Sequence, residues 1–436
     1  MTDATTRVGG AVTRIAAKSH VNNVGVSEDP ATSAQSVIRV KVIYASSTCS
    51  RAAFANLFQD ETRMPAQQAQ KYHRLMMQGL ARNGLQVIAV ASPPATRENS
   101  TARILAIQND FEKGVTYRYL RVFNWSPVRN LAALLQSFVA TWRELRSDQN
   151  TSVVCDVLNF SVATGALAAA KLLGRRATGI VTDIPRMLSN RPGPLVRSAI
   201  TLAMRRYDSY LYLTQEMDSI VGRSRAPYIV IEGQVDIDEG QARNNLSDKH
   251  AKRVCMYAGA LEERYGVDQL VAGFLRAGHP DWELHIYGTG ELSRELSRIT
   301  AKAPAVKYFG HVRNDRLVTE LTKASLLVNP RPTADEFVKF SFPSKNMEYM
   351  VSGTPLLTSN LPGMPAEYKP HVYLLKTTSA EGIADSLRTL FDADPLALHL
   401  KGARAKRFVL EEKNNVTQAA RLAKLILEPN PTRTRA

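Results

Sequence analysis

The feature that most constrains the fold is a strand–helix–strand pattern that begins twice along the chain. Near the N-terminus, VIRVKVIYAS (Val37–Ser46) is rich in β-branched residues and predicts a buried strand. Helical spacing follows through Leu75 and Leu80, Asn83-Gly84 stops it, and Val87–Ser92 predicts the next strand. A helix between consecutive strands makes them parallel, so this unit predicts a doubly wound sheet with helices on both faces.

The pattern continues through SVVCDVLNF, VATGALAAAKLLG, ATGIVTDIP, DSYLYLT and APYIVIEGQVD, and after a polar stretch it restarts at VCMYAGAL. We therefore expect an α/β protein of two Rossmann-like, doubly wound domains that face each other across a cleft. The predicted parts are a flexible tail (1–36), a first Rossmann-like domain (37–235), a linker (236–253), a second Rossmann-like domain (254–405), a C-terminal helix that packs back (406–428) and a tail (429–436).

Charge separates the two halves. Residues 1–230 hold 28 Lys and Arg against 15 Asp and Glu, a net +13, whereas residues 231–436 hold 28 against 25, a net +3. The first half is therefore expected to meet something anionic, such as nucleic acid, a membrane surface or a phosphorylated acceptor. The motifs that RNA and DNA binders carry are missing, so no nucleic-acid partner is predicted.

One basic segment, Ile184–Tyr207, contains five arginines and no acid. Four of its apolar residues are candidates for a stripe beside the arginines: Leu195, Ile200, Leu202 and Met204. The segment is either a patch for a membrane surface or lipid diphosphate, or the solvated face of a core helix. No apolar run reaches the ~20 residues of a membrane span, and the first 36 residues lack a signal-peptide core.

Three cysteines, Cys49, Cys155 and Cys255, are far apart, odd in number and without metal spacing. They predict buried thiols and a protein of the reducing cytosol. The basic first half adds the expectation of peripheral binding at the inner face of the cell membrane. Asp236–Asp238 (DID) lies in the linker and is expected to be surface charge. No metal or other cofactor is expected.

The most informative segment is FPSKNMEYMVSGTPLL (Phe342–Leu357), which follows the strand-like SLLVNPRP. Pro343 suits the first turn of a helix, and the free N–H groups of Ser344, Lys345 and Asn346 would form an anion site there. Glu348 lies on the face of Ser344, one turn further, and suits a sugar diol. The anion site and Glu348 together predict that this helix binds a nucleoside diphosphate. The alternative is a helix that is merely capped.

Glycines mark several strand ends in the second half: Gly259, Gly288, Gly290 and Gly310, the last followed closely by Val312. A glycine allows a ligand to approach the backbone closely, so these positions are candidates for a ligand crevice beside the same helix. A tight turn is the alternative for the Gly288–Gly290 pair.

From Val254 to Glu428 the chain resembles the nucleotide-binding domain of glycosyltransferase family 4, which contains retaining GT-B enzymes. The resemblance rests on an ordered series: YAGALEERYGVDQL, ELHIYGTGEL, VKYFGHV, ASLLVNPRP, FPSKNMEYMVSGTPLL and LPGMPAEY. The form SFPSKNMEYMVSGTPLL is similar to members from capsule and exopolysaccharide gene clusters. The first half resembles the family's acceptor domain more loosely, through GLQVIAVAS, CDVLNFS and VTDIP.

The resemblance implies transfer of a hexose-type sugar from a nucleotide-sugar to a lipid-linked or oligosaccharide acceptor, with retention, in bacterial surface polysaccharide synthesis. It assigns Glu348 to the ribose. Lys345, and Arg264 as a substitute, would stabilise the departing diphosphate without a metal. Asn159 stands where members often carry an active-site histidine.

The chain also departs from the family pattern. Phe340 stands where the family has a first glutamate, and the nearby acid, Glu336, has a different spacing. Ala260 and Tyr265 replace the family's phosphate-binding arginine and lysine, and SSTCSRAAFANLF replaces its N-terminal glycine-rich loop. Two other readings stay open: a nucleotide-sugar 2-epimerase and a non-catalytic GT-B partner of another transferase.

Overall fold

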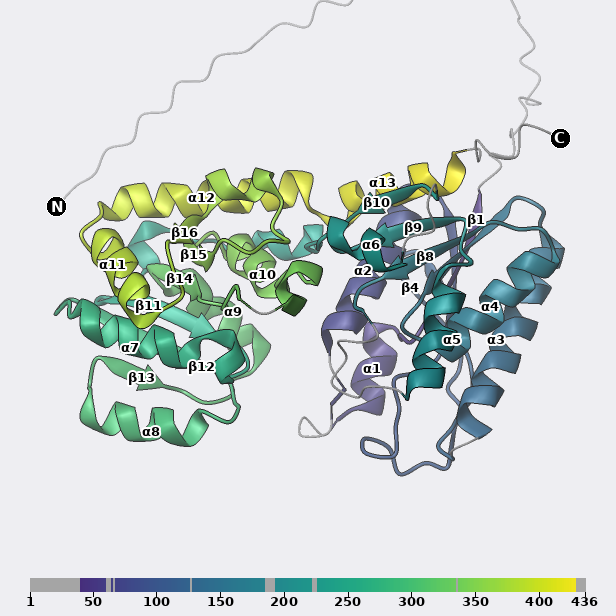
Figure 1. Ribbon diagram of the computed structural model, residues 1–436, viewed down its shortest axis with the longest axis horizontal. Coiled ribbons are helices and arrows are strands. Elements are labelled where there is room, and N and C mark those ends of the chain that lie inside the picture. The colour runs from purple at the N-terminus through teal and green to yellow at the C-terminus, as the bar shows by residue number, and fades with distance from the viewer. Residues whose placement is uncertain are drawn as a thin grey trace, which may run out of the picture. The chain divides into compact units, whose positions relative to one another are not determined.

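Two parallel β-sheets, each with helices packed on it, organise the chain (Figure 1). The computed structural model describes residues 40–59, 64–65, 67–125, 128–184, 193–221, 226–334 and 336–428. The predicted tails at 1–36 and 429–436 lie outside these residues. The prediction of two doubly wound, Rossmann-like α/β halves is confirmed.

The first sheet has eight strands. In spatial order they are β10 (Tyr228–Val230), β9 (Ser209–Tyr212), β8 (Ala177–Val181), β7 (Thr151–Asp156), β1 (Lys41–Ser46), β2 (Gln86–Ala91), β5 (Val115–Tyr119) and β4 (Asp110–Glu112). All pairs are parallel except β4 with β5, and β3 (Ile104–Leu105) pairs with β6 (Val122–Phe123) separately. Its helices are α1 (Arg51–Leu57), α2 (Gln67–Arg82), α3 (Val128–Ser147), α4 (Phe160–Leu172), α5 (Pro194–Met204) and α6 (Asp218–Val221).

The second sheet has six strands, all parallel. Their spatial order is β13 (Val306–Tyr308), β12 (Trp282–Tyr287), β11 (Arg253–Ala258), β14 (Leu326–Asn329), β15 (Leu356–Ser359) and β16 (Tyr373–Leu375). Its helices are α7 (Val267–Ala277), α8 (Ser293–Lys302), α9 (Asn314–Lys323), α10 (Ser344–Ser352), α11 (Ala380–Phe391) and α12 (Pro395–Glu412).

Each sheet has one place where the order of strands reverses. In the first sheet the chain runs from β1 to β2 on one side and later adds β7 on the other. In the second sheet β12 and β14 flank β11 in the same way. Neighbouring connections leave in opposite directions at such a switch point, and the gap beyond the strands' carboxyl ends is where α/β proteins bind ligands.

The C-terminal segment consists of two helices where the sequence predicted one. α12 ends at Glu412, and α13 (Asn415–Leu427) packs against α2 of the first domain. The break arises because Asn414 caps α13, accepting hydrogen bonds from the first-turn N–H groups at 2.9 Å. The crossing chain also pairs with the linker: the Val235 N–H donates to the Lys413 carbonyl at 3.0 Å, and the Asn415 N–H donates to the Val235 carbonyl at 2.8 Å.

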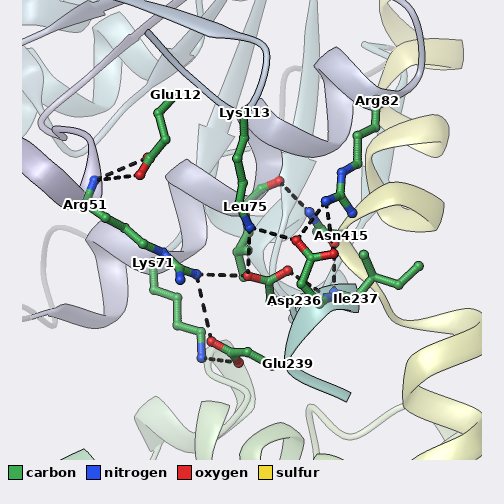
Figure 2. A network of polar contacts seen from close by, with 11 residues as sticks. Arg51, Lys71, Leu75, Arg82, Glu112, Lys113, Asp236, Ile237, Glu239 and Asn415 are labelled. Atoms are coloured by element: carbon green, nitrogen blue, oxygen red, sulfur yellow. Dashed lines mark hydrogen bonds and ion pairs between the residues drawn. The ribbon is translucent and has the colours of Figure 1, made fainter. Parts of the chain in front are cut away.

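The expectation that Asp236–Asp238 is surface charge is wrong for Asp236, which is buried, and holds for Asp238, whose side chain is 44% exposed (Figure 2). The acids of this segment meet four basic residues of the first domain: Arg51, Lys71, Arg82 and Lys113. Asp236 is 1% exposed at its side chain and lies 2.9 Å from the Arg51 guanidinium. Asp238 and Glu239 pair with the other cations at 2.7 to 2.9 Å. The linker is thus anchored by charge to the first domain.

Candidate functional site

Helix α10, which forms from the segment FPSKNMEYMVSGTPLL, begins at the switch point of the second sheet. Pro343 is its N-cap rather than its first helical residue, with an extended ψ of 111°. The Asn346 N–H, predicted to be free, donates to the Pro343 carbonyl at 3.0 Å. The Asn346 side chain is buried and accepts a hydrogen bond from Asn329 on β14 at 2.7 Å. The anion site at the helix start therefore has two free N–H groups, those of Ser344 and Lys345, instead of the three that were predicted.

Lys345 extends from this helix start to the end of β11. Its ammonium donates to the Tyr257 hydroxyl at 2.9 Å and lies 4.7 Å and 5.4 Å from the ring centres of Tyr257 and Tyr265. A Cβ added to Gly259 would lie 1.6 Å from the Lys345 Nζ, so a side chain at position 259 would displace the ammonium. The absence of a side chain at Gly259 thus makes room for the Lys345 ammonium at the carboxyl end of β11.

Burial governs the proton on this lysine. The pKa of Lys345 is lowered to about 8, chiefly by desolvation and also by the nearby Arg331 guanidinium, while Glu348 and Glu262 oppose the shift. An ammonium held partly out of water favours the approach of an anion, because the anion replaces the hydration that the protein has removed.

Glu348 lies one turn further along the same helix. Its side chain is exposed although protein atoms surround it densely, as at the bottom of a concave surface. This crowding raises the pKa of its carboxyl group through desolvation, and Lys71, Glu239 and Lys345 act on it through charge. Among the described residues, no hydrogen bond engages the carboxylate, so it is available to a ligand's hydroxyl groups.

The predicted glycines divide into two groups. A Cβ on Gly288 would lie 1.9 Å from the Gly259 carbonyl oxygen, and one on Gly290 would lie 2.3 Å from that of Leu261. These two glycines therefore allow two loops to pack backbone against backbone, which fits the tight-turn alternative. Gly310 has open space around its Cβ position, and Val312 packs against the core of the second domain.

Arg264 does not reach the lysine site as a free cation. Its guanidinium pairs with Glu262 at 2.5 Å, and the side chain is 56% exposed. A second arginine, Arg331, stands two residues after β14 and lies 5.7 Å from the Tyr265 ring centre, while the Arg264 guanidinium lies 5.0 Å from the same ring centre. Sequence reasoning missed Arg331, although its place between two prolines at a strand end was a usable signal.

The departures from the family pattern also have structural roles. Phe340 is 3% exposed and packs within the core of the first domain, so an apolar contact stands where the family has a glutamate. Glu336 starts the short η7 turn (Glu336–Phe340), and its side chain lies outside the description. Tyr265 turns its ring toward Lys345, and the Ala260 carbonyl accepts the Tyr257 hydroxyl at 2.9 Å. The Tyr265 ring is thus part of the pocket of the lysine, whereas position 260 contributes only its backbone carbonyl.

Asn159 lies at the other switch point, in the first domain. It is the N-cap of α4, but its side chain makes no capping bond, and its buried amide nitrogen has no partner among the described residues. It lines a cavity of about 340 Å³ together with Ser47 and Ser92, which follow β1 and β2. Asn159 thus belongs to a cavity of the first domain whose lining does not include Lys345.

The basic segment Ile184–Tyr207 is only partly described. Residues 185–192 and the side chains of Leu195 and Arg197 lie outside the description. Met204 is buried in the core and Ile200 packs against it, so these two residues fit the alternative of a core helix rather than a membrane-facing stripe. Leu202 is exposed. Within the described part of the chain, no helix combines the length and the apolar character that a membrane span requires.

The fold and the site define a class of protein: this is the GT-B architecture of glycosyltransferases. Residues 238–408, which include the lysine site, match the family model for glycosyl transferases group 1. No curated protein sequence matches the chain.

Solved structures resemble the chain over nearly its whole length. Sucrose-phosphate synthase from Thermosynechococcus elongatus is 13% identical over 89% of this chain and 98% of its own, with a TM-score of 0.60. The lipopolysaccharide outer core galactosyltransferase WaaB is 14% identical over 88% and 99%, with a TM-score of 0.57. Anabaena HepE in complex with UDP and glucose is 13% identical over 88% and 99%, with a TM-score of 0.55. Identities this low establish the fold alone.

Proposed function

We propose that this protein is a retaining glycosyltransferase that moves a sugar from a nucleotide-sugar donor to a lipid-linked saccharide in bacterial surface polysaccharide synthesis. The observation that carries the proposal is Lys345, a desolvated ammonium at the β11/β14 switch point with the available carboxylate of Glu348 one turn away. A cation beside a carboxylate suits a nucleoside diphosphate, which presents a diphosphate beside a ribose diol.

The chemistry follows from charge. Breaking the bond between the donor sugar and the diphosphate leaves negative charge on the diphosphate. The Lys345 ammonium and the N-terminus of α10 would stabilise this charge in a partly dehydrated setting, where electrostatic interactions are strong. Arg331, adjacent at the end of β14, would add a second cation to the same group. Glu348 would accept hydrogen bonds from the ribose hydroxyls.

An exposed apolar stripe on α3 supports an acceptor at a membrane surface. Its four residues recur every three or four positions on one face of the helix and are 36 to 60% exposed: Val128, Leu131, Leu135 and Val139. The next turn of this face carries the exposed Arg143 and Arg146. Apolar side chains beside arginines are typical of a helix that lies on an anionic bilayer.

Retention and the role in surface polysaccharide synthesis rest on the resemblance to family 4 members of capsule and exopolysaccharide gene clusters. The likeness of the whole chain to a lipopolysaccharide galactosyltransferase agrees with this role at the level of fold.

The test starts with a thermal-shift panel of UDP, GDP and ADP, which identifies the nucleotide. The matching nucleotide-sugars are then incubated with lipid-linked saccharides and the products are analysed by mass spectrometry. We expect transfer, and we expect Lys345→Met to abolish most of it while the exposed-lysine control Lys302→Met has no effect. Binding of no nucleotide would favour the non-catalytic partner, and a 2-epimerised donor without transfer would favour the epimerase.

A further inference from the structure

The cavity of the first domain lies where that sheet has its own switch point. It is about 340 Å³ in volume and is bounded by the segments that follow β1, β2 and β7 and by the start of α3. Its polar side chains include Ser47, Ser92, Arg121, Arg129, Asn159 and Ser161. Within the part of the chain that the structure describes, no acidic residue is in its lining.

The two arginines have no carboxylate partner. Among the described residues, no ion pair engages Arg121 or Arg129. Arg129 donates from Nη2 to the Ala95 carbonyl at 2.7 Å, which fixes the direction of its guanidinium. Partial burial lowers the pKa of Arg129, because desolvation disfavours its charge. A half-buried cation without a counter-charge gives the cavity a positive potential, which favours an anionic ligand.

The structure also ties the backbone of Arg121 to the helix that carries Arg129. The Arg121 backbone N–H donates to the Gln136 side-chain oxygen at 3.0 Å, and the Gln136 amide donates back to the Arg121 carbonyl at 3.0 Å. Gln136 and Arg129 both belong to α3, so this two-bond clamp keeps the backbone of Arg121 beside that helix. The Arg121 side chain itself is exposed, so its guanidinium can turn toward a ligand in the cavity.

The start of α4, which also borders the cavity, adds hydrogen-bond donors. α4 is 13 residues long, and its N-terminus points its first-turn N–H groups and dipole toward Asn159 and Ser161 in the lining. The Asn159 amide nitrogen is buried and lacks a partner among the described residues, although a buried donor is normally satisfied. A ligand made only of acceptors would satisfy this donor and both guanidinium groups.

We propose that this cavity binds a phosphoryl group of the acceptor substrate, held by Arg121, Arg129 and the N-terminus of α4. A phosphoryl group carries negative charge and several acceptor oxygens, which guanidinium groups bind in pairs. The volume leaves room for the first part of the attached molecule. The assignment to an acceptor rests on the proposed transferase function, whereas binding of the phosphoryl group does not.

The direct test uses inorganic pyrophosphate as the probe, titrated calorimetrically into the full chain. Arg121→Gln is expected to weaken binding at least tenfold, and Arg129→Gln similarly, because each removes a charge-assisted bond. Arg298→Gln, which changes an exposed arginine of α8 outside the cavity, is the matched control and should bind as the parent does. Because Arg121 is exposed, its variant should fold, and Arg129→Lys, which keeps the charge, should recover most of the binding.

Lys345→Met separates this cavity from the lysine site. We expect one pyrophosphate site to survive in Lys345→Met and to be lost in the Arg121→Gln, Arg129→Gln double variant. If only Lys345→Met loses binding, or if the double variant binds as the parent does, the proposal is overturned. UDP titrated into the double variant reports on the donor site independently, so failure of the proposed function and failure of this proposal are distinguishable.

Two further probes distinguish the source of the phosphoryl group. Glucose 1-phosphate represents a soluble sugar phosphate, and farnesyl diphosphate represents a lipid diphosphate. Tighter and arginine-dependent binding of either, relative to pyrophosphate, supports an acceptor of that class. If neither binds with dependence on Arg121 and Arg129, the acceptor assignment is overturned.

Discussion

The pH dependence of nucleotide binding reports on Lys345. Burial lowers the pKa of Lys345 to about 8, whereas an unfolded or solvated lysine titrates near 10.5. Binding of a diphosphate requires the charged form and restores a pKa close to the ordinary one. Between these two values, each bound diphosphate must therefore be accompanied by uptake of a proton, and affinity falls as pH rises.

The magnitude follows from the pKa difference. At pH 9.5 the free protein holds the proton on roughly one site in thirty, so affinity should drop about thirtyfold from pH 7, or about 2 kcal/mol. Lys345→Arg stays charged at all these pH values, and Lys345→Met is never charged. Both variants should show only the pH dependence that the nucleotide itself contributes. The measured quantity is the ratio of parent to variant Kd from UDP titrations at pH 7, 8, 8.7 and 9.5.

Stability provides the matching test with the opposite sign. Between pH 8 and 10.5 the unfolded chain binds the proton and the native chain does not, so the free energy of unfolding rises with pH. Relative to Lys345→Met, the parent should gain about 2 kcal/mol between pH 7 and pH 9.5 in urea unfolding. Parallel pH profiles for parent and Lys345→Met, in both binding and unfolding, would refute the assignment of Lys345 as a desolvated anion-binding cation.

Four other outcomes are expected. Glu348→Gln should weaken UDP about tenfold but 2′-deoxy-UDP far less, as measured by calorimetry, and equal losses would indicate a structural role. Arg264→Ala should change UDP affinity less than twofold, because its guanidinium already pairs with Glu262; a tenfold loss would contradict this. Asp236→Ala should lower the free energy of unfolding by about 3 kcal/mol, since it leaves a buried ion-pair site broken; a loss below 1 kcal/mol in urea would exclude that anchor. Replacing Leu131 and Leu135 together with serine should reduce flotation with anionic vesicles without changing UDP affinity, and unaltered flotation would reject the α3 stripe as the membrane contact.

The sequence by itself determined the two-domain fold and singled out the helix start that carries the candidate donor site. Strand and helix periods are local properties, so the restart at VCMYAGAL was enough to predict two parallel sheets. The start of α10 was also local, because a proline, a short polar run and an apolar helix stand together in the chain. Glu348 and Lys345 could be selected for the same reason: the helical period alone places them on adjacent faces of one helix.

The tertiary structure decided what these residues meet. Lys345 lies beside Tyr257 and Gly259 only because α10 and β11 come together at the switch point, across some 85 residues that no local pattern relates. The same holds for Arg121 and Arg129, whose cavity requires the ends of three strands and the start of α3. Asp236 was misjudged for a physical reason: a carboxylate's exposure depends on the cations that pack against it, and these come from α1 and a turn more than a hundred residues earlier.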